Sequence, residues 1–109
     1  MPDDGRSYRE YYPRTELYGA DGTVAKNVVL NKGTFSNVQM SAVSTAAKLH
    51  TFVLDFSYDN AVWYNHYTSG APELTKQLIA PSVSARFWRL SSDAVAGAHT
   101  EDLVLAASP

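Results

Sequence analysis

Residues 85–90 read Ala85-Arg86-Phe87-Trp88-Arg89-Leu90, and this stretch points most directly to the fold. In an extended strand successive side chains point to opposite faces, so Ala85, Phe87 and Arg89 share one face while Arg86, Trp88 and Leu90 share the other. Neither face is wholly apolar. We therefore predict a strand at the rim of a packed sheet, with its aromatic rings buried and its guanidinium groups directed to water or to a partner.

Composition limits the classes of protein to which the chain can belong. With 109 residues and 45% apolar content, it suits one domain with a modest core. Charged residues make up 18% and the formal net charge is −2, so no global positive field would attract nucleic acid or an anionic membrane. The absence of cysteine excludes disulfides, thiolate catalysis and the usual structural zinc sites. We expect neither a nucleic-acid partner nor membrane insertion.

The amino terminus begins with the acidic stretch Met1-Pro2-Asp3-Asp4-Gly5, which no apolar run follows. Such a start is unlike a secretory signal, and nowhere does the chain approach the roughly 20 apolar residues of a membrane helix. We expect a soluble protein made in the cytoplasm.

Residues 1–13 show neither a helical nor a strand period and predict an extended arm. Chain ends are commonly loose, which is one interpretation of this segment. The other is that its tyrosines dock on a neighbouring subunit. The candidate partner-binding residues are Tyr8, Arg9, Tyr11 and Tyr12.

Short strand-like runs alternate with turns from residue 14 onward. Residues 15–18 and 23–29 flank an Asp-Gly pair at 21–22, a pattern that predicts a hairpin. The clearest alternation lies in residues 48–57, where Phe52, Leu54 and Phe56 share one face. Residues 73–80 fit a helical turn as well as a strand, and Pro81 ends either.

The remaining strands are expected at residues 34–40, 61–67, 83–90 and 102–107. Seven or eight short strands without a long amphipathic helix predict an all-β fold, an antiparallel β-sandwich or jelly roll. We assign it to residues 14–109 as one domain, preceded by the arm.

Two motifs resemble those of discoidin-like (coagulation factor 5/8 C-type) domains. Residues 57–63, Ser-Tyr-Asp-Asn-Ala-Val-Trp, look like that family's Ser-x-Asp-Gly-x-x-Trp turn, with Asn60 in place of glycine. Residues 85–90 are similar to its Ala-Arg-Tyr-aliphatic-Arg-Leu strand. The likeness covers residues 29–105 and lacks the family's amino-terminal part. It implies a truncated jelly roll, and members typically bind glycans or lipid head groups through loops at one end. Similar modules occur in bacteriophage structural proteins.

An aromatic cluster next to a Ser/Gly loop suggests a glycan site; its members are Trp63, Tyr64, His66 and Tyr67. Their rings would stack on the apolar face of a sugar while Asn65, His66 or Thr68 bonds to its hydroxyls. The alternative is that one set of these alternating residues is core. Arg86 and Arg89 either pair with Asp55 or Asp59 or bind an anionic ligand. The candidate ligand-binding residues are Trp63, His66, Tyr67, Arg86 and Trp88.

No metal or catalytic motif is present in the sequence. The three histidines, His50, His66 and His99, lack the spacing of a zinc helix, although folding could bring two together. We expect no cofactor, and calcium held by loop carboxylates is the nearest alternative. The chain has no Gly-x-Ser-x-Gly elbow and no phosphate-binding glycine loop, so we expect it not to be an enzyme.

Together these features predict a non-catalytic structural or attachment subunit of a larger assembly. A virion protein of the phage tail, baseplate or capsid-decoration type fits best, with the arm docking on another protein subunit in a homo- or hetero-oligomer. The alternative is a carbohydrate-binding, lectin-like module that recognises a cell-surface glycan, and one protein can combine both roles.

Overall fold

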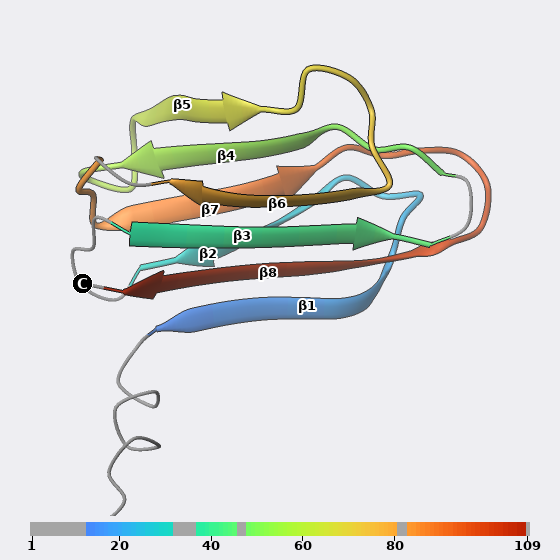
Figure 1. Ribbon diagram of the computed structural model, residues 1–109, viewed down its shortest axis with the longest axis horizontal. Coiled ribbons are helices and arrows are strands. Elements are labelled where there is room, and N and C mark those ends of the chain that lie inside the picture. Colours follow the sequence, from blue (N-terminus) through green and yellow to red (C-terminus); the bar gives the residue numbers. More distant parts are fainter. Residues whose placement is uncertain (1–12, 32–36, 46–47, 81–82, 109) are drawn as a thin grey trace, which may run out of the picture.

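Two four-stranded antiparallel sheets pack face to face in the described part of the chain, residues 13–31, 37–45, 48–80 and 83–108 of a computed structural model (Figure 1). The first sheet has the order β1-β8-β3-β6 and the second the order β2-β7-β4-β5. The strands are β1 (Arg14–Asp21), β2 (Lys26–Leu30), β3 (Asn37–Ser44), β4 (Phe52–Ser57), β5 (Trp63–Thr68), β6 (Thr75–Ala80), β7 (Phe87–Ser92) and β8 (Thr100–Ser108). The predicted all-β sandwich is confirmed.

Period-two alternation places the core between the sheets. In β4, Phe52 and Leu54 are completely buried and Phe56 packs against the same core, as the sequence predicted. The first sheet contributes Met40, Leu103 and other inward side chains. Each fully buried large apolar side chain contributes about 1.5–3 kcal/mol relative to an exposed one.

The stretch around Trp88 lies in the middle of its sheet rather than at the rim. β7 pairs with β2 on one side and with β4 on the other, so the rim position expected from sequence is wrong. Trp88 and Leu90 face the core, while Arg89 lies on the outer face. That outer face is half-buried rather than enclosed in the core, and this accounts for the polar residues in a central strand.

The predicted hairpin at the Asp-Gly pair is also wrong. β1 pairs with β8 and β2 pairs with β7, so the chain passes from one sheet to the other between them. The Asp21 carboxylate accepts hydrogen bonds from the Thr23 amide at 2.9 Å and from its hydroxyl at 2.6 Å. The Gly22 amide donates to the His99 carbonyl at 3.0 Å. These bonds fix a crossing turn.

Two other expectations concern segments near the ends of strands. Residues 73–80, which left helix and strand open, contain strand β6, paired with β3. The arm lies outside the described residues except for Pro13, whose carbonyl accepts a hydrogen bond from the Ala107 amide.

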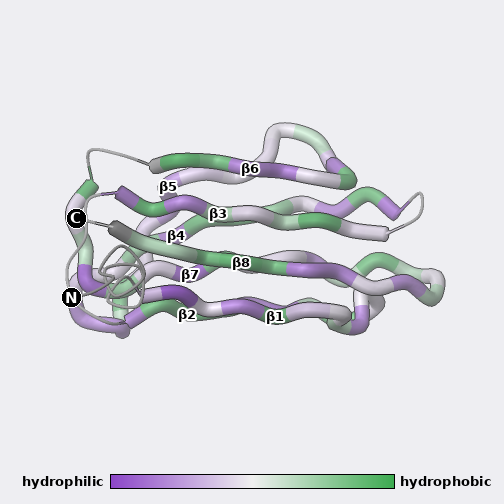
Figure 2. The backbone as a smooth tube through the Cα atoms, turned by 60° about the horizontal axis from the view of Figure 1, so that its bottom comes forward, coloured by the Kyte–Doolittle hydropathy of each residue, from purple (hydrophilic) through white to green (hydrophobic). Residues whose placement is uncertain are grey.

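Hydropathy along the chain follows this arrangement. Figure 2 shows a hydrophilic start of β8 and a hydrophobic remainder, which supplies Leu103 and Leu105 to the core. Within the described residues, no helix has the length and apolar character needed to cross a membrane.

Candidate binding surface at the β4–β5 end

The turn between β4 and β5 is rigid because its own side chains bond its backbone. The Asp59 carboxylate accepts hydrogen bonds from the amides of Ala61 and Val62, both at 2.9 Å, and from the Ser57 hydroxyl at 3.1 Å. These bonds stabilise the charged form and lower the pKa of Asp59. Asn60 has φ 62°, a left-handed conformation that asparagine accepts better than most residues.

An aromatic cluster adjoins this turn, and we call Phe56, Tyr58, Val62 and Tyr64 the aromatic corner. The Phe56 ring lies 5.6 Å from that of Tyr64, stacked, and 5.7 Å from that of Tyr58, edge-on. Tyr58 and Tyr64 stay 59% and 48% exposed, and Val62 is 52% exposed. The corner therefore presents apolar surface to solvent on an ordered base.

The aromatic corner is exposed because β5 is the edge strand of its sheet. Tyr64 pairs in register with Phe56, so it lies on the inward face of the sheet. Tyr58 follows the end of β4 and packs its ring edge-on against that of Phe56. A side chain on the inward face of an edge strand has a neighbouring strand on one side only, so part of it stays exposed to solvent. The result is a pair of tyrosine rings that pack against Phe56 but remain about half exposed to solvent.

The outer face of the same sheet carries a polar array centred on Arg89 of β7. Its guanidinium carbon lies 4.2 Å from the centroid of a Trp63 ring, and its Nη2 donates to Asp55 Oδ2 at 3.1 Å. The Asn65 amide donates to Asp55 Oδ1 at 3.2 Å and to the Thr68 hydroxyl at 3.0 Å. The predicted pairing of Arg89 with a carboxylate is thus found, and it involves Asp55.

The predicted ligand residues do not form one site. Trp88 is 1% exposed and packs in the core, so it offers no surface to a ligand. His66 is half-buried, with its ring 5.8 Å from that of Trp88, and Tyr67 packs against the core beneath the Lys76 ammonium. Trp63 is half-buried under Arg89 on the outer face.

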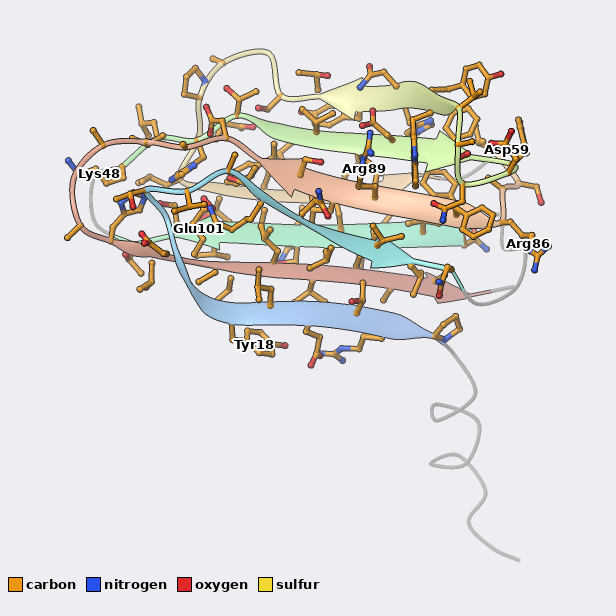
Figure 3. All side chains as sticks on the ribbon, turned by 180° about the vertical axis from the view of Figure 1, so that it is seen from behind. Tyr18, Lys48, Asp59, Arg86, Arg89 and Glu101 are labelled. Atoms are coloured by element: carbon orange, nitrogen blue, oxygen red, sulfur yellow. The ribbon has the colours of Figure 1, made fainter. Side chains whose placement is uncertain are left out.

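Arg86 is the one predicted ligand residue that is both exposed and close to the turn. Figure 3 places it at the same end of the sandwich as Asp59. Its guanidinium carbon lies 5.6 Å from the Phe87 ring centroid. The predicted arm residues Tyr8, Arg9, Tyr11 and Tyr12 lie outside the described residues.

Sequence reasoning placed Tyr64 in the aromatic cluster but not among the candidate ligand-binding residues, and it did not treat Tyr58 as a ligand residue. The signal was present in the alternation, because Tyr58 continues the Phe52, Leu54, Phe56 face. What the alternation could not show was that the neighbouring strand lies at the sheet edge.

A different surface lies on the outer face of the first sheet. Arg14, Gln39, Ser41, Gln77, Val104 and Ala106 line a shallow depression of about 320 Å³ there. None of these lining residues is aromatic. Arg14 bonds to the hydroxyl of Tyr18, which raises the pKa of the guanidinium. This depression can hydrogen-bond a ligand but cannot stack on one.

Histidines that are far apart in sequence meet near the other end of the sandwich. His50 Nε2 and His99 Nε2 are 2.6 Å apart, and Glu101 lies beside His50. The sequence had led us to expect no metal site, since the histidine spacing gave no indication of this contact.

Comparison with known proteins supports the all-β sandwich fold. No protein-family model matches the chain, and no curated protein matches it. The chain is similar in structure to the crystal structure of the Yersinia pseudotuberculosis-derived mitogen YPM, with a TM-score of 0.58 and 14% sequence identity. The match covers 88% of this chain and 86% of that one.

Proposed function

We propose that this chain is a non-catalytic attachment module that binds a glycan over the aromatic corner. The observation that carries the proposal is the exposure of the Tyr58 and Tyr64 rings, 59% and 48%, on a base fixed by Phe56. Tyrosine rings stack on the apolar face of a sugar, and their hydroxyl groups bond to its rim.

The rigidity of the turn supports this function. The Asp59 bonds to Ala61 and Val62 order the backbone beside the rings before any ligand arrives. Pre-ordering lowers the entropic cost of binding. Arg86, exposed at the same end, supplies a cation for an acidic or strongly polar sugar.

The resemblance to discoidin-like domains agrees with this placement. Residues 57–63, one of the two similar motifs, form the turn beside the aromatic corner. Members of that family use loops at one end of the jelly roll to bind glycans or lipid head groups. We propose a distant relation to that family on the strength of the two motifs.

A glycan array tests the proposal directly. The wild-type chain should bind a restricted set of glycans, and the double variant Tyr58→Ser, Tyr64→Ser should lose that signal. Tyr18→Ser is the matched control, because Tyr18 is 56% exposed but lies on the first sheet. Absence of binding by the folded wild type, or an equal loss in the control, would contradict the proposal.

We further propose that the module serves as a subunit of a larger assembly, of the virion type. The support comes from the tyrosine- and arginine-rich arm, residues 1–13, since such side chains are enriched at protein interfaces. Deletion of residues 1–12 should convert an oligomer into a monomer in sedimentation experiments while leaving the melting temperature nearly unchanged. Normal assembly of the truncated chain would refute this role.

A further inference from the structure

A cluster of buried polar groups lies near the end of the sandwich opposite to Asp59 and Arg86. Figure 3 shows Glu101 toward that end, on the same side as Lys48. Glu101 and His50 are completely buried, and His99 is half-buried. The ligand atoms of these three residues lie within 4.8 Å of one another. Three strand ends and two loops converge here. Strands β2, β7 and β8 supply Lys26, Ser92 and Glu101, and the β3–β4 and β7–β8 connections supply His50 and His99.

The hydrogen-bond partners of His50 fix its protonated nitrogen. Its Nδ1 lies 2.8 Å from Glu101 Oε1 and 3.0 Å from both the carbonyl and a carboxylate oxygen of Asp93. Carbonyl and carboxylate oxygens can only accept hydrogen bonds. The Ser92 hydroxyl, also close to Nδ1, gives its hydrogen to Glu101 at 2.7 Å. His50 therefore carries its hydrogen on Nδ1.

The same reasoning applies to His99. Its Nδ1 faces the carbonyl oxygen of Gly97, which can only accept, so the hydrogen of this ring also lies on Nδ1. In their neutral forms both rings then have a bare Nε2. These two nitrogens face each other at 2.6 Å, a contact that needs one added cation: a proton shared by an imidazolium–imidazole pair, or a metal ion that displaces this proton.

Histidines that ligate metals have this arrangement of partners. A ligating ring offers one nitrogen to the ion and donates its other N–H to a carboxylate or a backbone carbonyl, which orients the ring. Glu101 does this for His50, and the Gly97 carbonyl does it for His99. A zinc ion held by both Nε2 atoms needs them about 3.3 Å apart, given Zn–N bonds of about 2.0–2.1 Å. The rings must therefore separate by a small movement.

The charges around the pair favour a cation. Glu101 and Asp93 face His50, and Asp21 lies near enough to His99 for the two to interact electrostatically. On the positive side, Lys26 binds Glu101 at 2.9 Å. The Lys48 ammonium group lies next to Gly97, in the space that a side chain at position 97 would occupy. Three carboxylates thus oppose two ammonium groups.

Space beside the His99 nitrogen depends on Gly22. A Cβ atom at position 22 would overlap the His99 ring at Nε2. Glycine at position 22 therefore leaves room for the His99 ring. The φ angle of Gly22 lies outside the left-handed range, so its backbone conformation does not itself require glycine. The requirement for a small residue comes from the His99 ring. Because His99 is half-buried and lies in a loop, solvent can deliver an ion to this side of the pair.

We propose that His50 and His99 bind one late first-row divalent metal ion, of the zinc class, through their Nε2 atoms. Glu101 and the Gly97 carbonyl orient the two rings, and water fills the remaining coordination positions. Imidazole nitrogens suit zinc, copper and nickel, whereas calcium prefers oxygen ligands. This inference is independent of the proposed glycan site, which lies at the other end of the sandwich.

Calorimetric titration of the full chain with zinc, after removal of metals with EDTA, tests the proposal. We expect one ion per chain in the wild type and no uptake by His99→Ala. His66→Ala is the matched control, since it removes the remaining histidine and should bind zinc as the wild type does. Gly22→Ala, which keeps both ligands but displaces the His99 ring, should weaken binding.

Circular dichroism establishes that each variant is folded. If His99→Ala does not fold, Gly22→Ala provides the second readout, together with the visible spectrum of bound Co²⁺ in the wild type. Failure of the folded wild type to take up zinc or cobalt would overturn the proposal, as would equal binding by a folded His99→Ala. A glycan array can fail without affecting these results.

Discussion

Replacement of the buried carboxylate of Glu101 tests how the core accommodates its charges. Glu101 is completely buried, accepts a hydrogen bond from Lys26 Nζ at 2.9 Å and another from Ser92 at 2.7 Å. The Lys26 side chain is itself 10% exposed. In Glu101→Leu this ammonium group keeps its burial and loses its carboxylate, while the nearby His50 N–H keeps Asp93 and the Ser92 hydroxyl as acceptors.

The size of the effect follows from the burial of both partners. Removal of one member of a buried ion pair costs about 3–5 kcal/mol, because the remaining charge is left uncompensated. A domain of this size has a free energy of unfolding of about 5–15 kcal/mol, so the loss is a large fraction of the total. Replacement of both charges, with Lys26→Met and Glu101→Leu together, should cost about 1 kcal/mol or less. The two substitutions should therefore couple by about 2 kcal/mol or more.

Urea unfolding gives the free energies needed for this double-mutant cycle. The solutions should contain EDTA so that no bound metal contributes to stability. Trp88, 1% exposed, is expected to report unfolding by a change in fluorescence. The reasoning is wrong if Glu101→Leu costs less than about 1 kcal/mol, or if the double variant loses the sum of the two single losses.

Three further predictions concern the core and the β4–β5 turn. Leu54→Ala should lower the free energy of unfolding by about 2–5 kcal/mol, because Leu54 is completely buried. Val53→Ala, on the outer face of the same strand, should lower it by less. Equal losses in urea unfolding would contradict the assigned faces. Asn60→Ala should lower the free energy of unfolding by about 1 kcal/mol, because the φ angle of 62° at this position disfavours alanine. Asn60→Gly should leave it nearly unchanged. Thermal unfolding measures the difference, and equal melting temperatures for the two variants would refute the left-handed turn. Because hydrogen bonds lower the pKa of Asp59, its contribution to stability is complete above the ordinary aspartate pKa of about 3.9 and is lost as the pH falls through its lower folded value. Stability measured against pH should therefore fall less steeply in acid for Asp59→Asn than for the wild type, and identical slopes would contradict this role.

The strands could be predicted from the sequence because each side of a strand has its own environment. Phe52, Leu54 and Phe56 recur at every second position, and the structure places them on the core face of β4. The pairing of strands could not be predicted in the same way. An Asp-Gly pair fits a hairpin, yet here Asp21 and Gly22 form a turn between sheets, because Gly22 bonds to distant His99.

The candidate sites were less accessible to sequence reasoning than the strands. Exposure of Tyr58 and Tyr64 depends on β5 lying at a sheet edge, which is a property of strand order. The contact between His50 and His99 joins residues 49 positions apart. Local patterns contain no information about either arrangement. By contrast, the pairing of Arg89 with Asp55 could be anticipated, because a half-buried guanidinium group needs a carboxylate.

The central claim, a glycan site at the aromatic corner, is tested most directly by nuclear magnetic resonance. Amide spectra should be recorded while the chain is titrated with a panel of common sugars at millimolar concentration. The account predicts that shifts cluster at Tyr58, Val62 and Tyr64, with Arg86 also affected. Shifts confined to Gln39, Gln77 and their neighbours on the first sheet, or no shifts with any sugar, would contradict it.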